Sequence, residues 1–303
     1  MRRVIEPGHL LAVGVVADDS EEHADAARAW VLDRPSHFVD GNLLSADAAD
    51  HDRTTARHRR ENVDPIPITD ELRGADEVAV DGQSHALEKA GDDDSRVVIF
   101  TGEGRSFSAG ADLKSGIDRD VTRILLKEYR PVLETIAEIP KPVMAVVPGS
   151  AAGIGMSMAL QCDLVLMADD AFMLSPFTTI SLVPDGGLTW LLVRQLGYRR
   201  AFQLSIECER IPAARCVELG LANRTAPADE LQTAALEWAE ALAQRAPLSM
   251  AATKKAMRFA NDNDWGELFR LEAQLQGELL GTDDNVEGVN AFLEKRTPEF
   301  KGE

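Results

Sequence analysis

Short apolar runs alternate with amphipathic stretches in the part of the chain that follows residue 95. Three runs, Arg96–Phe100, Pro142–Val147 and Asp163–Met167, are rich in aliphatic residues, and turn-forming or charged residues bound them. Continuous apolar runs of this length are typical of buried strands. The pattern therefore predicts three strands that are covered on both faces.

Between and after these runs, apolar positions recur at the spacing of a helix. The predicted helices span residues 120–139, 156–161, 188–195, 229–245, 264–280 and 284–296. Pro140 and Pro247 are expected to end two of them, and Ser249 can cap the helix that follows Pro247. Strands followed by helices, and then a purely helical tail, predict an α/β chain with a C-terminal helical module.

The first 94 residues have a different character. They hold all six histidines of the chain, and residues 47–85 show no sustained period of either 2 or 3.6. We therefore expect three regions: an atypical, loop-rich N-terminal segment at 1–94, a core at 95–247 and a helical module at 248–303.

Composition narrows the possible functions. With 51 acidic against 32 basic residues the formal net charge is -19, which disfavours contact with nucleic-acid phosphates. No apolar run approaches the ~20 residues of a membrane span, and no signal peptide is evident at the N-terminus. The three cysteines form no CxxC pair, so neither a disulfide framework nor structural zinc is expected. These features predict a cytoplasmic protein.

Two glycine-rich turns follow predicted strands. Neither completes a dinucleotide-binding fingerprint, because Phe107 and Met158 stand where the third glycine belongs. Unpaired N–H groups at two such turns could converge into an oxyanion hole. Ordinary strand-to-helix turns would have the same small residues, so the residues alone leave both interpretations open.

Several motifs together resemble a known family. They are FSAGADLK at 107–114, KPVMAVVPGSAAGIG at 141–155, CDLVLMADDAFMLSP at 162–176, VPDGGLTWLLVRQLG at 183–197 and AFLEKRTPEF at 291–300. In this order and at this spacing they resemble the crotonase superfamily, also called the enoyl-CoA hydratase/isomerase family. The resemblance covers about 95–300. It implies a spiral core of ββα turns and C-terminal helices that form trimers or hexamers.

The resemblance also implies a site for an acyl-CoA thioester. By position in the motifs, the backbone N–H groups of Ala111 and Ile154 would form the oxyanion hole. Residues at six further positions would contact the substrate or its CoA: Ala109, Asp112, Leu113, Ser157, Phe292 and Lys295. No metal or redox cofactor is implied, since CoA is part of the substrate.

Two departures from the family pattern bear on the reaction. Hydratases of this family carry two glutamates where this sequence has Ser157 and Phe177, the latter expected to line the acyl pocket. Hydration needs water to be deprotonated while a proton reaches the α-carbon, work that two carboxylates share. Ordinary hydratase activity is therefore disfavoured.

One acid remains at a position that the family uses for catalysis. Asp185 matches the single carboxylate of the Δ3,Δ2-enoyl-CoA isomerases and of the phenylacetate-pathway isomerase, which the PDGG and TWLL residues most resemble. An Asp before Gly-Gly and a helix is also a good N-cap. The resemblance favours catalysis by Asp185.

We therefore expect an enoyl-CoA isomerase in which Asp185 moves a proton between two carbons. Three alternatives remain: a hydratase with an unusual site, a dehalogenase-like or hydrolase-like enzyme with Asp185 as nucleophile, and a non-catalytic acyl-CoA-binding protein.

Overall fold

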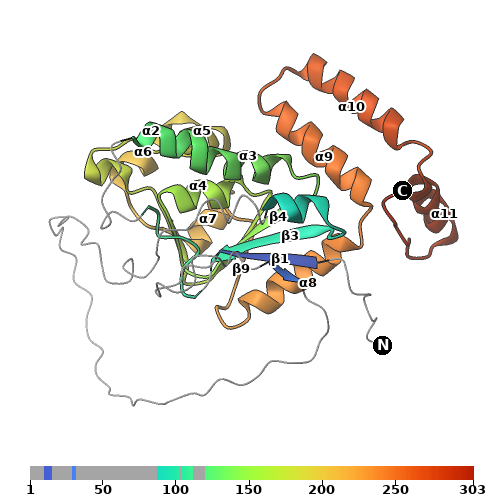
Figure 1. Cartoon of the computed structure of the whole chain (residues 1–303), viewed down its shortest axis with the longest axis horizontal. Helices are drawn as coiled ribbons and strands as arrows, with labels where there is room; N and C mark the ends of the chain where they lie inside the picture. Colours follow the sequence, from blue (N-terminus) through green and yellow to red (C-terminus); the bar gives the residue numbers. More distant parts are fainter. Residues whose placement is uncertain (1–9, 16–28, 32–86, 103, 112–119) are drawn as a thin grey trace, which may run out of the picture.

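The computed structural model describes residues 10–15, 29–31, 87–102, 104–111 and 120–303. A six-stranded sheet forms the centre of this part of the chain, in the order β2-β1-β3-β4-β6-β9 (Figure 1). Its strands are β1 (Leu10–Val15), β2 (Ala29–Val31), β3 (Val97–Gly102), β4 (Val143–Val147), β6 (Leu164–Ala168) and β9 (Arg224–Ala226). All neighbours are parallel except the pair of β1 and β2.

The three predicted strands are confirmed as β3, β4 and β6. Every residue of β4 is buried, as expected of a parallel strand that is covered on both faces. Two strands from the N-terminal segment also join this sheet, because β1 pairs with β3 from Leu10↔Val97 to Val15↔Gly102. These two strands lie within the segment 1–94 that the sequence predicts to be loop-rich. Residues 32–86, where the pattern is weakest, lie outside the described ranges.

A second, smaller sheet has the order β5-β7-β8. It contains β5 (Ser150–Ala152), β7 (Phe172–Leu174) and β8 (Ile211–Pro212). These strands are two or three residues long, too short to show a period in the sequence. Helix α4 (Ile154–Gln161) follows β5 directly, and only its last residue is not buried. A helix that is apolar on all sides belongs in a core.

The other helices that precede the C-terminal module surround the two sheets. They are η2 (Leu125–Tyr129), η3 (Phe177–Ile180), α2 (Val121–Ile124), α3 (Arg130–Glu138), α5 (Leu188–Leu196), α6 (Tyr198–Glu207), α7 (Ala213–Leu219) and α8 (Leu231–Ala243). Helices α3, α4 and α5 pack in sequence on one side of the main sheet, and α8 contacts β1, β3, β4, β6 and β9 on the other (Figure 1). The layers confirm the predicted α/β class.

The single helix predicted over 120–139 is wrong in detail. Between α2 and α3 the chain makes one π-helical turn, η2, in which the N–H of Arg130 bonds to the carbonyl of Leu125. The next residue, Pro131, has no N–H, and in an α-helix its ring would crowd the carbonyl four residues earlier. The wider turn accommodates that proline.

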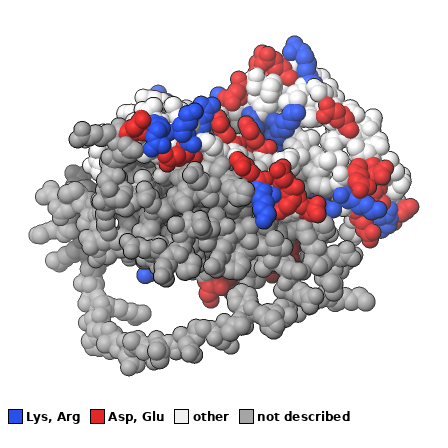
Figure 2. Space-filling model, in the orientation of Figure 1, with Lys and Arg blue, Asp and Glu red and all other residues white. Residues whose placement is uncertain are grey.

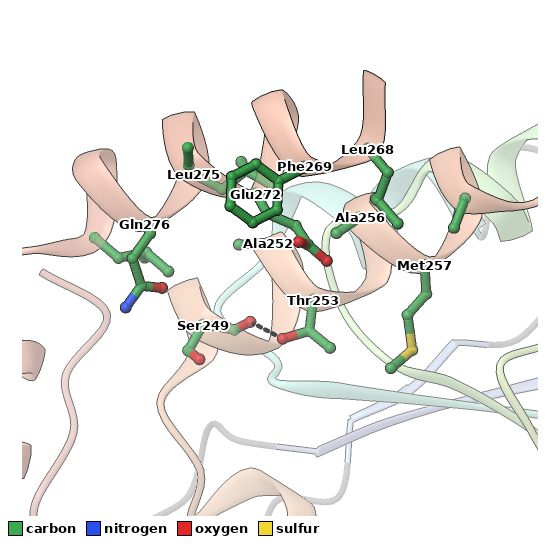
Figure 3. A pocket seen from close by; sticks show the side chains of 13 residues that line it. Ser249, Ala252, Thr253, Ala256, Met257, Leu268, Phe269, Glu272, Leu275 and Gln276 are labelled. Carbon is green, nitrogen blue, oxygen red and sulfur yellow. Dashed lines mark hydrogen bonds between the residues drawn. The ribbon is translucent and has the colours of Figure 1, made fainter. Parts of the chain in front are cut away.

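Three helices form the C-terminal module: α9 (Pro247–Ala260), α10 (Trp265–Leu279) and α11 (Asp283–Glu294). Pro247 occupies the first turn of α9, where a missing N–H costs little, and Ala246 is the N-cap. The expected cap at Ser249 is therefore wrong. Its carbonyl instead accepts a hydrogen bond from Thr253 Oγ1 at 2.7 Å (Figure 3).

A partly buried ion cluster attaches α9 to the core. Asp163, at the start of β6, bonds to Lys254 at 2.7 Å and to Arg258 at 2.8 Å. Lys254 Nζ also donates to the carbonyls of Ile136 and Lys141. The cationic donors thus have acceptors on several core elements, and α9 has a defined place beside the sheet.

Helix α10 lies along α9, and a groove runs between them (Figure 3). Side chains that line this groove include Ala252, Ala256, Met257, Leu268, Phe269 and Leu275. On the visible face of the described residues, acidic and basic side chains are interspersed rather than separated (Figure 2). None of the described helices is long and apolar enough to cross a membrane.

Candidate active site

Two turns lie side by side at one end of the parallel strands. Ser108 forms a parallel bridge with Ala151, and the N–H of Ala152 donates to the Ser108 carbonyl at 2.9 Å. The N–H groups of Phe107 and Ser108 both donate to the carbonyl of Ser150. This pairing aligns the segment 108–111 with the segment 151–154.

Glycine is required where the turns approach each other. Gly110 and Gly153 both have positive φ, at 100° and 57°. A Cβ on Gly110 would lie 3.2 Å from the Ala152 carbonyl oxygen, and one on Gly153 would lie 3.7 Å from the Cα of Gly110. The residues that follow these glycines, Ala111 and Ile154, are therefore held near each other.

The backbone N–H groups of Ala111 and Ile154 are the predicted oxyanion donors. Ile154 begins α4, and first-turn N–H groups have no partner within a helix. Among the described residues, no backbone hydrogen bond is donated by either N–H group. Two such donors beside a buried helix start can hold a developing oxyanion.

The loop that carries Asp185 packs on the same first turn of α4. A Cβ on Gly186 would collide with Ile154 Cδ1 and lie 2.9 Å from Ser157 Cβ. Ser157, fully buried, donates its hydroxyl to the Asp185 carbonyl at 3.0 Å. The predicted acid and one predicted oxyanion donor thus occur in one cluster.

The carboxyl group of Asp185 is poorly solvated. Its Oδ1 is buried and has no hydrogen-bond partner among the described residues. Burial, the cause identified for the shift, raises the pKa of Asp185 to about 6. A carboxyl group in this state can remove a proton near neutral pH and return it, as general acid–base catalysis requires.

The capping role that the sequence allowed for this carboxylate is wrong. The N-cap of α5 is Gly187, and no side chain caps that helix. The main-chain carbonyl of Asp185 accepts the Leu188 N–H at 3.0 Å instead. The side chain therefore makes no capping bond.

A family model described as "Enoyl-CoA hydratase/isomerase" matches residues 77–303. The chain belongs to this family. A Rhodobacter capsulatus relative named "Probable enoyl-CoA hydratase" is 39% identical over 211 residues, which are 69% of this chain and 82% of the relative. The 1,2-epoxyphenylacetyl-CoA isomerase of Escherichia coli K12 is 34% identical over 217 residues, or 70% of this chain and 83% of the relative.

A solved structure shares the fold of this family member. The crystal structure of an enoyl-CoA hydratase from Polaromonas sp. JS666 has a TM-score of 0.70 and 35% identity. The likeness covers 73% of this chain and 89% of that one. The crotonase-type core predicted from the motifs is thereby confirmed, and the chain is an acyl-CoA enzyme of the hydratase/isomerase family.

The two positions at which family hydratases carry glutamates lie close to the turns. Phe177 begins η3 and is only 7% exposed, with its ring tip 3.9 Å from a Cβ built on Gly153. Ser157 uses its hydroxyl on the Asp185 main chain. Phe177 therefore places an aromatic ring beside the two turns, and Ser157 makes a hydrogen bond to the Asp185 loop. Neither residue supplies a carboxylate.

The other predicted binding residues of this family member differ in where they lie. Ala109 is half-buried in the turn between Ser108 and Gly110, whereas Asp112 and Leu113 lie outside the described residues. Phe292 is 82% exposed on α11, and Lys295 ends that helix at a φ of 56°. Helix α11 lies beyond α9, away from α4 (Figure 1). Within one chain these two residues do not join the site.

Gly186 is a site residue that the sequence reasoning missed. Its φ of 59° and its contacts with Ile154 and Ser157 admit no side chain. The consecutive glycines after Asp185 were a signal for positive φ, since glycine is the default residue in that conformation. Their closeness to α4 has no signal in the local sequence.

Proposed function

We propose that this protein isomerises the double bond of an enoyl-CoA, with Asp185 as the group that moves the proton. The observation that carries the proposal is the buried, unpaired Asp185 carboxyl oxygen beside the start of α4. The family supplies the substrate class, a CoA thioester. Residues 157 and 177, where family hydratases carry glutamates, have no carboxylate.

The proposed reaction begins when the thioester carbonyl accepts hydrogen bonds from the N–H groups of Ala111 and Ile154. Asp185 takes a proton from C2, and the electron pair of that bond moves into a dienolate with its negative charge on the thioester oxygen. An oxyanion donor of this kind is worth ~3–4 kcal/mol to the rate-limiting barrier. Both donors are main-chain groups, so the Ile154 side chain does not remove one.

In the second step Asp185 returns the same proton to C4, and the double bond shifts from C3–C4 to C2–C3. No atom is gained or lost, so a single carboxyl group acts first as base and then as acid. A pKa of about 6 suits both steps, because the carboxylate predominates at pH 7 while its conjugate acid remains able to protonate a dienolate. The step needs no metal or redox cofactor.

Hydration of an enoyl-CoA is a second candidate. The Rhodobacter capsulatus relative at 39% identity is named as a hydratase, and so is an Escherichia coli K12 relative at 36%, the 2,3-dehydroadipyl-CoA hydratase. In this alternative Asp185 would activate an ordered water without a second carboxylate. The product would be a hydroxyacyl-CoA.

Product analysis separates these functions. The purified protein is incubated with straight-chain 3-enoyl-CoAs and with a ring-opened oxepin-type CoA, and formation of the conjugated thioester is followed. We expect the conjugated 2-enoyl-CoA to appear without a hydroxyacyl-CoA. A hydroxyacyl-CoA as the main product from 2-enoyl-CoAs would favour hydration. Release of free CoA would favour the hydrolase branch, and release of halide from an added halogenated aromatic acyl-CoA would favour the dehalogenase branch. Binding without turnover would favour a non-catalytic protein.

A further inference from the structure

Within the described part of the chain, Ser157 is the one member of the cluster whose side chain bonds to the loop that carries the acid. Its side chain is fully buried, and its hydroxyl donates to the Asp185 carbonyl at 3.0 Å. The same carbonyl accepts the N–H of Leu188, also at 3.0 Å. One carbonyl oxygen is therefore held from α4 on one side and from α5 on the other.

This arrangement fixes the main chain of Asp185 while leaving its carboxyl group unpaired. Had the hydroxyl donated to the carboxylate itself, it would have stabilised the anion and weakened the base. The bond goes instead to the peptide group, and no group in the described ranges bonds to Oδ1. The direction of the side chain is thus set without loss of basicity.

The same turn of α4 also carries a proposed oxyanion donor. Ile154 and Ser157 are three residues apart, a spacing that puts two residues on one face of a helix. Both contact the space around Gly186. A bond from Ser157 to the Asp185 loop therefore sets the acid relative to the Ile154 N–H, and the two groups must act on the same thioester.

We propose that Ser157 is a positioning residue, which aims the Asp185 carboxyl group at the substrate through its hydrogen bond to the Asp185 carbonyl. This rests on the proposed function of Asp185. The role differs from the direct substrate contact that the family position implied. Ser157 acts on the reaction through the loop and touches no reacting atom.

The test is Ser157→Ala, compared with wild type in full kinetics across pH 4.5–8.5. With the hydroxyl gone, the loop loosens and water reaches the carboxyl group. We expect kcat to fall about 10-fold, the scale set by the loss of one hydrogen bond that positions the base, with KM changed less than about 2-fold. The low-pH limb of the profile, where activity rises as Asp185 ionises, should move below 6, because burial is what raises the pKa of Asp185.

Ser205→Ala is the matched control. Ser205 is also buried, and its hydroxyl donates to a main-chain carbonyl, that of Ala201, at 2.8 Å. It should lose similar stability and keep wild-type kcat and pH profile. Ser157→Cys is nearly isosteric and keeps a weak donor, so it should change kcat and the pH limb in the same direction by less. Ser157→Cys therefore serves as the test variant if Ser157→Ala does not fold.

Asp185→Asn, measured alongside, separates the two ideas. If Asp185→Asn is inactive while Ser157→Ala and Ser157→Cys keep wild-type kcat and pH limb, the positioning role is overturned and the proposed function stands. If Asp185→Asn retains full isomerisation, the proposed function fails first. A fall in kcat with an unmoved pH limb, equal to that of Ser205→Ala, would also overturn the positioning role.

Discussion

The two consecutive glycines after Asp185 should respond very differently to alanine. Gly186 and Gly187 both have positive φ, at 59° and 76°. A Cβ on Gly187 would meet nothing within 4 Å, whereas one on Gly186 would meet Ile154 Cδ1 and Ser157 Cβ. The pair therefore separates backbone strain from steric contact at neighbouring positions of one loop.

The magnitudes follow from these two terms. Alanine in a left-handed conformation costs about 1–2 kcal/mol in the free energy of unfolding, and both variants incur that cost. Gly186→Ala adds an overpacking cost of about 1–3 kcal/mol, since Ile154 and Ser157 belong to a buried helix. We expect losses of about 1–2 kcal/mol for Gly187→Ala and about 2–5 kcal/mol for Gly186→Ala.

The kinetic difference should be larger than the difference in stability. In Gly186→Ala the new methyl group separates the loop from α4, and a misplacement of about 1 Å can cost on the order of 100-fold in rate. Gly187→Ala should keep kcat within about 3-fold of wild type. Urea unfolding gives the stabilities and the 3-enoyl-CoA assay gives kcat. Equal stabilities and equal kcat for the two variants would refute the close packing of Gly186 on α4.

Three further predictions concern the acid, the missing carboxylates and assembly. Asp185→Asn should lower kcat at least ~100-fold. Because folding raises the pKa of Asp185, the free energy of unfolding of the wild type should fall relative to that of this variant as pH rises from about 4 through 6, as measured by urea unfolding. Ser157→Glu with Phe177→Glu should introduce some hydroxyacyl-CoA formation from 2-enoyl-CoA; a crystal structure with neither side chain in the acyl pocket would contradict it. We also propose that the protein is a trimer or hexamer, to be measured by light scattering, and that truncation at about residue 260 gives monomers or aggregates with weaker acyl-CoA binding. A protein that is monomeric at micromolar concentration and fully active would contradict both this assembly and a CoA role for Lys295.

The assembly prediction has a basis in the C-terminal helices. Large apolar side chains are exposed there: Trp265 at 75%, Phe269 at 56%, Val286 at 50%, Val289 at 51%, Phe292 at 82% and Leu293 at 70%. Soluble monomers rarely expose large contiguous apolar patches. A neighbouring chain that covered them could also bring Phe292 and Lys295 to a CoA site that they do not reach within one chain.

Elements with strong, continuous patterns could be predicted from the sequence. The strands β3, β4 and β6 consist mostly of apolar residues because they are covered on both faces. The helices α8, α10 and α11 were predicted within three residues at each end. The strands of the smaller sheet were missed because two or three residues carry no period. Pro247 was misassigned because proline both follows helices and begins them.

The candidate site could be proposed from the sequence as a set of residues and not as an arrangement. Motif order pointed to Asp185, Ala111 and Ile154, and the same residues allowed a capping interpretation of Asp185. What distinguishes the two interpretations is which atom contacts α5. Helix α5 begins at Leu188, whose N–H donates to the main-chain carbonyl of Asp185. The Asp185 carboxyl oxygen Oδ1 therefore has no partner among the described residues.

The contact between α4 and the Asp185 loop limits which chemistry this site can perform. Ser157 reaches the Asp185 carbonyl with a short hydroxyl side chain, and Gly186 leaves no room beside it. A glutamate at 157 would remove that hydrogen bond and bring a larger side chain into the same space. A second carboxylate and a well-placed Asp185 therefore exclude each other here, so any hydration gained by such a substitution should come with a loss of isomerisation.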